Sequence, residues 1–420
     1  MSAWISRLIG AVVSIASIRI LTDILSVQEY AIFAILTGLI GWYGLVDLGL
    51  GFSCQNYISE NRAKGNETHG FVFHTLILSF VLLILFLMIL YFCSGILANL
   101  LLDKFTDISW EQKKMYVILS GSLLITYSLA TISYKIWYAQ QQGYLSNLVA
   151  LAASLLIFLG MLVVAQNNSV DYLLLGFLCF LAPNAFLGLA STAYQLIKGI
   201  FANRGDSFSR KIFQQLISRG IRFWGFSVMA VCVLQIDYIT LSQFASSKEI
   251  VIYNILTKIF ITVHFVYSAF LMAVWPNFTE LITNGKTKDI FKQLKTYIFL
   301  GISLMLLSTS FFVFYMPDVI NILAPTTNLI VDKSSIMLLG GYYIIRIWTD
   351  TFAMVLQSAN NLKPLWMWVP IQAMIGLGLQ IILTPIWGIN GIVVALIMSY
   401  ICTVSWILPK NVFKLKENNL

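Results

Sequence analysis

The chain has 420 residues, of which 59% are hydrophobic and 10% are charged, and its mean hydropathy is +0.84. Soluble globular domains are about 45–50% apolar and about 25% charged, so this chain has too few charges to cover a water-facing surface. The same composition excludes disorder, coiled coil, collagen and a disulfide scaffold. A bilayer-spanning helix needs about 20 apolar residues, so about a dozen spans with short loops would use the whole length. The composition therefore predicts a polytopic membrane protein without a sizeable soluble domain.

Apolar runs bounded by polar residues, glycine or proline predict an all-α chain with twelve transmembrane helices. In the first run Arg7 and Arg19 interrupt the apolar residues and no basic segment precedes it, so we interpret it as a retained membrane helix rather than a cleavable signal peptide. The predicted spans are about 4–22, 30–54, 71–98, 114–135, 144–165, 170–197, 221–243, 252–274, 296–316, 334–357, 365–384 and 389–408, with the residues at their ends counted as part of the connections.

The basic residues of the connections are unevenly divided between the two sides of the membrane. Seventeen of the 26 lysines and arginines fall in one set of connections and five in the opposite set, with the other four inside spans. Because basic residues mark the cytoplasmic side, both termini are predicted to be cytoplasmic. The net charge of +8 then reflects topology, and no nucleic-acid partner is expected because a basic soluble surface with interleaved aromatic residues is lacking.

The longest connection, at about 198–220, contains an amphipathic stretch. Ile212, Phe213 and Leu216 alternate there with Lys211 and Arg219, a pattern typical of a helix lying in the membrane interface. We therefore interpret residues 199–220 as a cytoplasmic connector, with a partner-binding role as the alternative.

Motifs for bond-making chemistry are missing. The five cysteines are scattered through apolar stretches and the three histidines lack metal-ligand spacing, so no metal site is expected. Gly285-Lys286-Thr287 resembles the end of a phosphate-binding loop, but Glu280 occupies the position where that loop needs glycine. The sequence therefore predicts neither a cofactor nor an enzyme.

An internal repeat relates the two halves at an offset of 220 residues. The segment 29–37 matches the segment 249–257 at five of nine positions, and Gly65 aligns with Gly285 without a gap. We infer two six-helix lobes, residues 1–198 and 221–420, that enter the membrane in the same sense. Such parallel repeats are typical of transporters, with a central cavity between the lobes.

Four short motifs along the chain resemble the polysaccharide-transporter branch of the MOP (multidrug/oligosaccharidyl-lipid/polysaccharide) exporter superfamily. They lie at the exit of the first predicted span, at the end of the second, in the seventh and eighth, and at the start of the last. The motifs are Ile20-Leu21-Thr22-x-x-Leu25-Ser26-x-x-Glu29-Tyr30, Asp47-Leu48-Gly49-Leu50, Asp237-Tyr238 with Ile252-Tyr253, and Gly388-Ile389-Asn390-Gly391.

This resemblance implies the MATE-like MOP fold and a Wzx-type flippase for O-antigen or capsule units. The implied substrate is an undecaprenyl-diphosphate-linked oligosaccharide, moved across the bacterial inner membrane by alternating access. H⁺ or Na⁺ as a coupling ion, membrane lipids and other polysaccharide-assembly proteins are the remaining implied partners. The twelve predicted spans depart from the fourteen of lipid II flippases.

Four basic residues inside spans are candidate ligands for the diphosphate, because intramembrane charges usually face a cavity or a partner. Lys258 has no acid on its own span. Arg346 stands one helical turn from Asp350, so a self-neutralising structural pair is the alternative there. Arg19 near the outer end of its span, and Arg7 near the cytoplasmic end, have alternative roles as interfacial anchors.

Three acids inside spans, Asp47, Asp237 and Asp350, are candidates for ion coupling or for salt bridges. Asp47 lies beside glycines near the end of its span, where capping is the alternative role. Asp237 is deeper, where it could couple an ion or pair with an arginine. His264 is interpreted as a satisfied packing residue.

Two other classes of function compete with the flippase. A cation-coupled multidrug antiporter of the MATE type would need an acid-dominated cavity, whereas the predicted spans hold four basic residues and three acids. A polysaccharide polymerase would need a long outer loop, and the longest outer connection predicted is 317–333.

Overall fold

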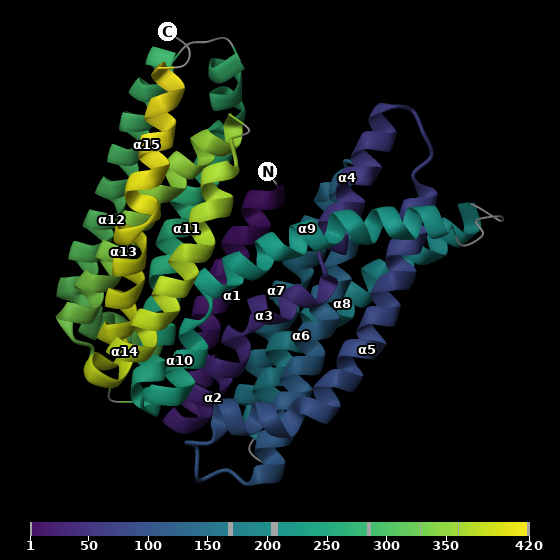
Figure 1. Cartoon of the computed structure of the whole chain (residues 1–420). Coiled ribbons are helices and arrows are strands. Elements are labelled where there is room, and N and C mark those ends of the chain that lie inside the picture. Colours follow the sequence, from purple (N-terminus) through teal and green to yellow (C-terminus); the bar gives the residue numbers. More distant parts are fainter. Residues whose placement is uncertain are drawn as a thin grey trace. The chain divides into compact units, whose positions relative to one another are not determined.

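The computed structural model describes residues 2–166, 171–202, 209–283, 287–327, 329–359 and 361–417. Every regular element within these ranges is a helix (Figure 1), so the predicted all-α class is confirmed. The contacts divide the chain into two compact units, Met1–Val231 and Cys232–Leu420.

Unit 1 is built around one long helix, α6, against which α5 and α8 pack most extensively, while α1 packs along α7. Gly188 of α8 lies against Ala130 of α6, and small residues of this kind let membrane helices approach closely. The helices are α1 (Ser2–Ile24), α2 (Val27–Gly38), α3 (Ile40–Gly44), the 3-10 helix η1 (Leu45–Asp47), α4 (Leu50–Ala63), α5 (His69–Leu102), α6 (Trp110–Ala139), α7 (Gly143–Ala165), α8 (Tyr172–Ala202) and α9 (Arg210–Leu234), the last of which continues into unit 2.

The second predicted span, 30–54, is broken into α2, α3, η1 and α4. The break centres on Leu48 and Gly49, whose φ angles of 47° and 71° are both left-handed. The Asp47 carboxylate stabilises this turn by accepting a hydrogen bond of 2.7 Å from the Gly49 amide. The predicted capping role of Asp47 is therefore present in the structure.

Helix α9 crosses unit 1 at this break and lies across the long helices in Figure 1. The Gly220 carbonyl lies directly over Gly49. Two hydrogen bonds of 2.9 Å join the same elements. The Trp224 indole donates to the Leu45 carbonyl, and the Ser53 hydroxyl donates to the Leu216 carbonyl. The predicted connector boundary at residue 220 thus falls inside one continuous helix, because the same amphipathic face continues to Trp224.

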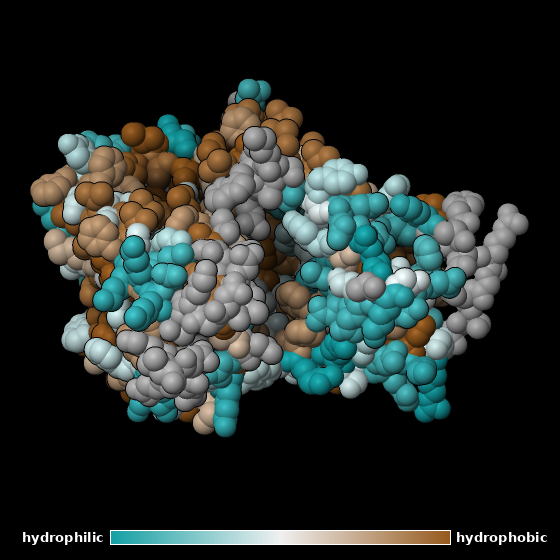
Figure 2. Space-filling view, turned by 90° about the horizontal axis from the view of Figure 1, so that it is seen from above, coloured by the Kyte–Doolittle hydropathy of each residue, from teal (hydrophilic) through white to brown (hydrophobic). Residues whose placement is uncertain are grey.

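Polar residues gather where α4 ends and α9 crosses unit 1 (Figure 2). Arg219 forms an ion pair of 2.8 Å with Glu60, and its guanidinium lies 3.9 Å from the centre of the Tyr57 ring. The polar face of α9 therefore interacts with the polar end of α4, whereas residues such as Leu216 are buried.

Replacing Gly49 with alanine should destabilise unit 1. A left-handed backbone costs a non-glycine residue about 1–2 kcal/mol, and the added Cβ would also overlap the Gly220 carbonyl. We expect a lower midpoint of thermal unfolding in detergent. Gly44→Ala is the matched control, because no heavy atom lies within 4 Å of the added Cβ. Equal midpoints for the two variants would contradict this account of the break.

Unit 2 packs α11 and α12 against α13, with α14 and α15 on its other side. Helix α14 is interrupted at Gly388 (φ 55°, ψ −135°), where the Glu249 carboxylate occupies the space that a Cβ would need. The helices are α10 (Asp237–Phe244), α11 (Ser247–Thr283), α12 (Thr287–Leu323), α13 (Lys333–Ser358), α14 (Lys363–Cys402) and α15 (Val404–Glu417).

Equivalent positions of the internal repeat form the same local structure. Ser26 and Glu29 make reciprocal hydrogen bonds at the start of α2, and Ser246 and Glu249 make the same set at the start of α11. This capping box satisfies backbone amides that a helix start otherwise leaves unpaired. The offset of 220 residues therefore relates structure as well as sequence.

The predicted spans fall mainly on helix within the described residues, but 30–54 is broken at Leu48–Gly49 and 221–243 is divided between α9 and α10 at residues 235–236. The count of twelve single helices is therefore not confirmed. In the part of the chain that the structure describes, nine helical stretches are long and apolar enough to cross a membrane, and one of them, Lys363–Lys414, contains both of the last two predicted spans. The remaining spans, 4–22 and 334–357, lie on α1 and α13. The structure is therefore that of the predicted polytopic membrane protein.

Candidate functional site

Unit 2 holds the densest group of charged and polar side chains inside predicted spans. Arg346 and Asp350 are one turn apart on α13, with 3.9 Å between Arg346 Nε and Asp350 Oδ2. His264 of α11 is closer to the acid, with 3.1 Å between His264 Nε2 and Asp350 Oδ2. The pair expected from the spacing is therefore present, and a third residue from another helix joins it.

The side chain of Arg346 is 19% exposed, yet the hydrogen bonds of its guanidinium are incomplete. Its Nε is buried and makes no hydrogen bond to any residue that the structure describes. The guanidinium carbon lies 6.0 Å from the centre of the Tyr342 ring and 5.7 Å from that of Tyr343. Two aromatic rings thus lie near the cation, and its Nε is a donor without a hydrogen bond among the described residues.

His264 has the role expected of a packing residue. It is buried, its ring centre lies 5.4 Å from that of Tyr343, and it also contacts Asp350. It holds the acid from the side of α11, so Asp350 has a partner besides Arg346.

Asp237, at the first turn of α10, is buried and bound to neutral groups. Its carboxylate accepts a hydrogen bond from the Tyr253 hydroxyl and one of 3.0 Å from the Tyr238 amide. Asn254 donates to the Tyr238 hydroxyl at 2.8 Å, which fixes that ring beside the acid. None of the ion pairs among the described residues includes Asp237, so the alternative of a salt bridge to arginine is not what the structure contains.

Lys258 lies on α11 and is half-buried. It follows Tyr253 by five residues, which rotates it by roughly 140° around the helix axis. Val251 and Ile255, which lie on the same side of α11 as Lys258, are 0% exposed, and so the lysine lies among buried residues of this helix.

Two buried glutamines of α14 were not anticipated. Gln380 accepts a hydrogen bond of 3.2 Å from the Thr240 hydroxyl, while its Nε2, like that of Gln372, lacks a partner among the described residues. The sequence could have indicated these two residues, because polar amides inside the predicted span 365–384 need partners in a membrane helix.

No group of three or more histidine, cysteine or acidic residues suited to a metal ion occurs in the described ranges.

In unit 1 the acid Asp47 pairs with Lys135, at the end of the predicted span 114–135. Lys135 Nζ lies 3.0 Å from Asp47 Oδ2 and 3.8 Å from the centre of the Phe52 ring. The Asp47 side chain is 9% exposed and that of Lys135 21%. This pair joins η1 to α6 at the break in the second span, so Asp47 has both a cap and an ion pair.

The two arginines of the first span are in different situations. Arg19 forms an exposed ion pair with Asp23, one turn further along α1, which agrees with an interfacial anchor. The side chain of Arg7 lies outside the described residues.

The described residues form two helical units with charged side chains buried among membrane helices, as in a polytopic membrane protein, and solved structures identify the fold. An inward-facing multidrug-resistance MATE transporter of the MOP superfamily matches with a TM-score of 0.78 and 12% identity, covering 98% of this chain and 96% of that one. The lipid II flippase MurJ in an inward closed conformation matches with a TM-score of 0.75 and 14% identity, covering 99% of this chain and 90% of that one. The MOP fold implied by the four motifs is confirmed.

The family follows from a relative in sequence. A protein of Yersinia pseudotuberculosis named for O-antigen export is 35% identical over 412 residues, which cover 97% of this chain and 93% of the relative. This chain belongs to that family of O-antigen exporters. No family model matches the sequence. The prediction that the protein is a transporter and not an enzyme is confirmed by this membership.

Proposed function

We propose that the protein is a flippase that moves an undecaprenyl-diphosphate-linked oligosaccharide unit across the bacterial inner membrane by alternating access. The observation that carries the proposal is the match over almost the full length to a relative named for O-antigen export. The same match favours this substrate over the multidrug substrates of a MATE-type antiporter, since the likeness to MATE transporters at 12% identity concerns the fold alone.

The buried end of Arg346 is the proposed ligand of the diphosphate. A guanidinium binds phosphate oxygens in pairs, and the buried Nε of this one makes no hydrogen bond to the part of the chain that the structure describes. Asp350 is 3.9 Å away and is also held by His264, so a phosphate oxygen can displace it from Arg346 without leaving the acid unpartnered. Lys258 and, from the sequence alone, Arg7 stay as further proposed cations, whereas the exposed ion pair of Arg19 with Asp23 supports its alternative role as an interfacial anchor.

The two lobes, 1–198 and 221–420, and the connector 199–220 are proposed as the moving parts. The repeated capping boxes support two equivalent lobes. Both termini are proposed to lie in the cytoplasm, as the basic connections indicate, and entry of the diphosphate from the cytoplasmic leaflet is proposed from the relative named for export. Association with other polysaccharide-assembly proteins is also proposed from the family.

Expression of the chain in a strain that lacks its own unit flippase tests the proposal. We expect surface polysaccharide to return, and we expect no gain in drug tolerance in a strain that lacks its efflux pumps. Drug tolerance without surface polysaccharide would assign the chain to the antiporters instead.

Coupling to H⁺ or Na⁺ is proposed to act through Asp237. Its buried carboxylate accepts hydrogen bonds from the neutral Tyr253 hydroxyl and Tyr238 amide, and none of the ion pairs of the described residues includes it, so a bound cation would neutralise its charge. Asp237→Asn should bring transport with and without an ion gradient to the same rate. Asp23→Asn, at an exposed acid of α1, is the control and should keep the gradient dependence. Transport in vesicles with imposed gradients gives the comparison, and an unchanged gradient dependence of Asp237→Asn would exclude this site.

A further inference from the structure

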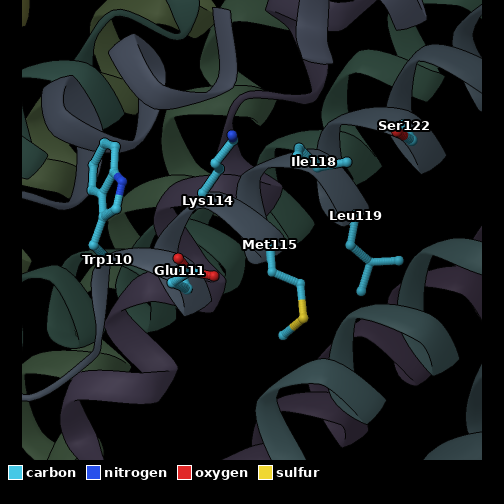
Figure 3. A pocket seen from close by; sticks show the side chains of 7 residues that line it. All are labelled: Trp110, Glu111, Lys114, Met115, Ile118, Leu119 and Ser122. Carbon is cyan, nitrogen blue, oxygen red and sulfur yellow. The ribbon is translucent and has the colours of Figure 1, made fainter. Parts of the chain in front are cut away.

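A hollow of about 510 Å³ lies along the first four turns of α6 in unit 1. Figure 3 shows its side chains following one face of the helix, with Trp110, Glu111 and Lys114 at one end and Ser122 at the other. The stretch from Trp110 to Ser122 is about 18 Å long at the helical rise of 1.5 Å per residue. The hollow is therefore long, and polar at one end.

Between these ends the lining is apolar. Met115, Ile118 and Leu119 occupy the middle of the hollow, and none of them is fully buried. Such a strip is suited to a hydrocarbon chain. Two turns beyond Ser122 on the same face of α6, Leu129 is only 3% exposed, so the face is packed there.

The polar end has the composition of a membrane interface. Trp110 is 46% exposed and rests against Gly95 of α5, and Lys114 Nζ lies 5.7 Å from the centre of the Tyr91 ring. Tryptophan and tyrosine concentrate at the level of the lipid headgroups. The neighbouring helix α5 exposes a row of large apolar side chains, which places it against lipid: Phe80, Ile84, Met88, Phe92 and Ile96.

The two charges at this end have opposite sign and do not neutralise each other. Glu111 and Lys114 are three residues apart on α6, yet they are absent from the ion pairs formed by the described residues. An acid in the first turn of a helix is favoured by the helix dipole, so Glu111 alone indicates no ligand. Glu111 and Lys114 together place one anionic and one cationic side chain at the end of an apolar hollow, where a ligand can contact both.

We propose that this hollow binds a phospholipid whose headgroup carries a phosphate and a primary ammonium, as in phosphatidylethanolamine. Lys114 binds the phosphate, Glu111 accepts hydrogen bonds from the ammonium, and one acyl chain lies along Met115, Ile118 and Leu119. An anionic headgroup, including a diphosphate, would bring surplus negative charge beside Glu111. A choline headgroup has no N–H to donate to that carboxylate.

Quenching of Trp110 fluorescence by phospholipids with brominated acyl chains tests the proposal in the purified full-length protein. The contribution of Trp110 is the difference between the wild type and Trp110→Phe, because the chain has 11 tryptophans. We expect phosphatidylethanolamine to occupy the hollow about three- to fivefold better than phosphatidylglycerol or phosphatidylcholine at equal mole fraction. This preference is the size of effect that one exposed ion pair has on binding.

Two variants assign the headgroup contacts. Glu111→Gln should remove the preference for phosphatidylethanolamine over phosphatidylglycerol, and Lys114→Gln should weaken quenching by all three lipids. Lys292→Gln on α12, an exposed lysine of unit 2, is the matched control and should change nothing. Circular dichroism confirms that each variant is folded.

Three results would overturn the proposal: equal quenching by the three lipids, a preference for phosphatidylglycerol, or displacement by a polyprenyl diphosphate at lower concentration than by phosphatidylethanolamine itself. The last result would assign the hollow to the transported lipid. Because the assay contains no transport step, its outcome is independent of the proposed flippase activity.

Discussion

Replacing Arg346 with alanine should lower the delivery of surface polysaccharide by about ten- to a hundredfold in a strain that depends on this chain. A hydrogen bond to a charged group contributes about 1.5–3 kcal/mol, which corresponds to that range of rates when the phosphate loses this partner. Arg346→Lys should retain an intermediate rate, because an ammonium keeps the charge but lacks the planar pair of donors.

The control for Arg346 is Arg19→Ala, which removes an arginine from an exposed ion pair of α1. Exposed pairs contribute about 0–1 kcal/mol, so this variant should deliver polysaccharide at nearly the wild-type rate. Protein levels in the membrane must be matched by immunoblot. Full activity of Arg346→Ala at equal level would rule out this arginine as a ligand of the diphosphate.

Replacing Lys135 with methionine should have the largest effect on the stability of unit 1. The change leaves the Asp47 carboxylate, only 9% exposed, without its ion partner between η1 and α6. Removing one member of a buried pair costs about 3–5 kcal/mol, and the partial exposure of Lys135 lowers this expectation to about 2–3 kcal/mol. Unfolding in detergent by denaturant provides the free energy.

The double variant Lys135→Met/Asp47→Asn distinguishes the lost ion pair from lost packing. Asparagine removes the unpaired charge, while its side-chain oxygen can still accept the hydrogen bond from the Gly49 amide. We expect the double variant to recover more than half of the lost free energy. If it is no more stable than the single variant, the lysine acts through its hydrocarbon stem and not through its charge.

Much of the fold follows from the sequence because membrane spans are set by hydropathy and length. The predicted span 71–98 lies within α5, and the repeat that aligned Glu29 with Glu249 proved to be two identical capping boxes. The break at Leu48–Gly49 was harder to predict from the sequence. A glycine after an aspartate indicates a turn, but the left-handed backbone at Leu48 depends on packing beneath α9.

The candidate site was predictable only along single helices. The spacing of Arg346 and Asp350 places them on one face of a helix, and this pair is present. By contrast, His264 reaches Asp350 across 86 residues, and Lys135 reaches Asp47 across 88. Such pairs depend on how helices are rotated against each other, for which the apolar pattern of a membrane helix carries little information, because lipid-facing and core-facing residues are equally apolar.

Transport by the purified protein in lipid vesicles tests the flippase assignment most directly. The substrate is a polyprenyl-diphosphate oligosaccharide with a fluorescent sugar, whose outer-leaflet fraction is measured with a membrane-impermeant quencher. We predict transfer between leaflets with the wild type and transfer about ten- to a hundredfold slower with Arg346→Ala. Transfer no faster than in protein-free vesicles, under every imposed ion gradient, would contradict the account.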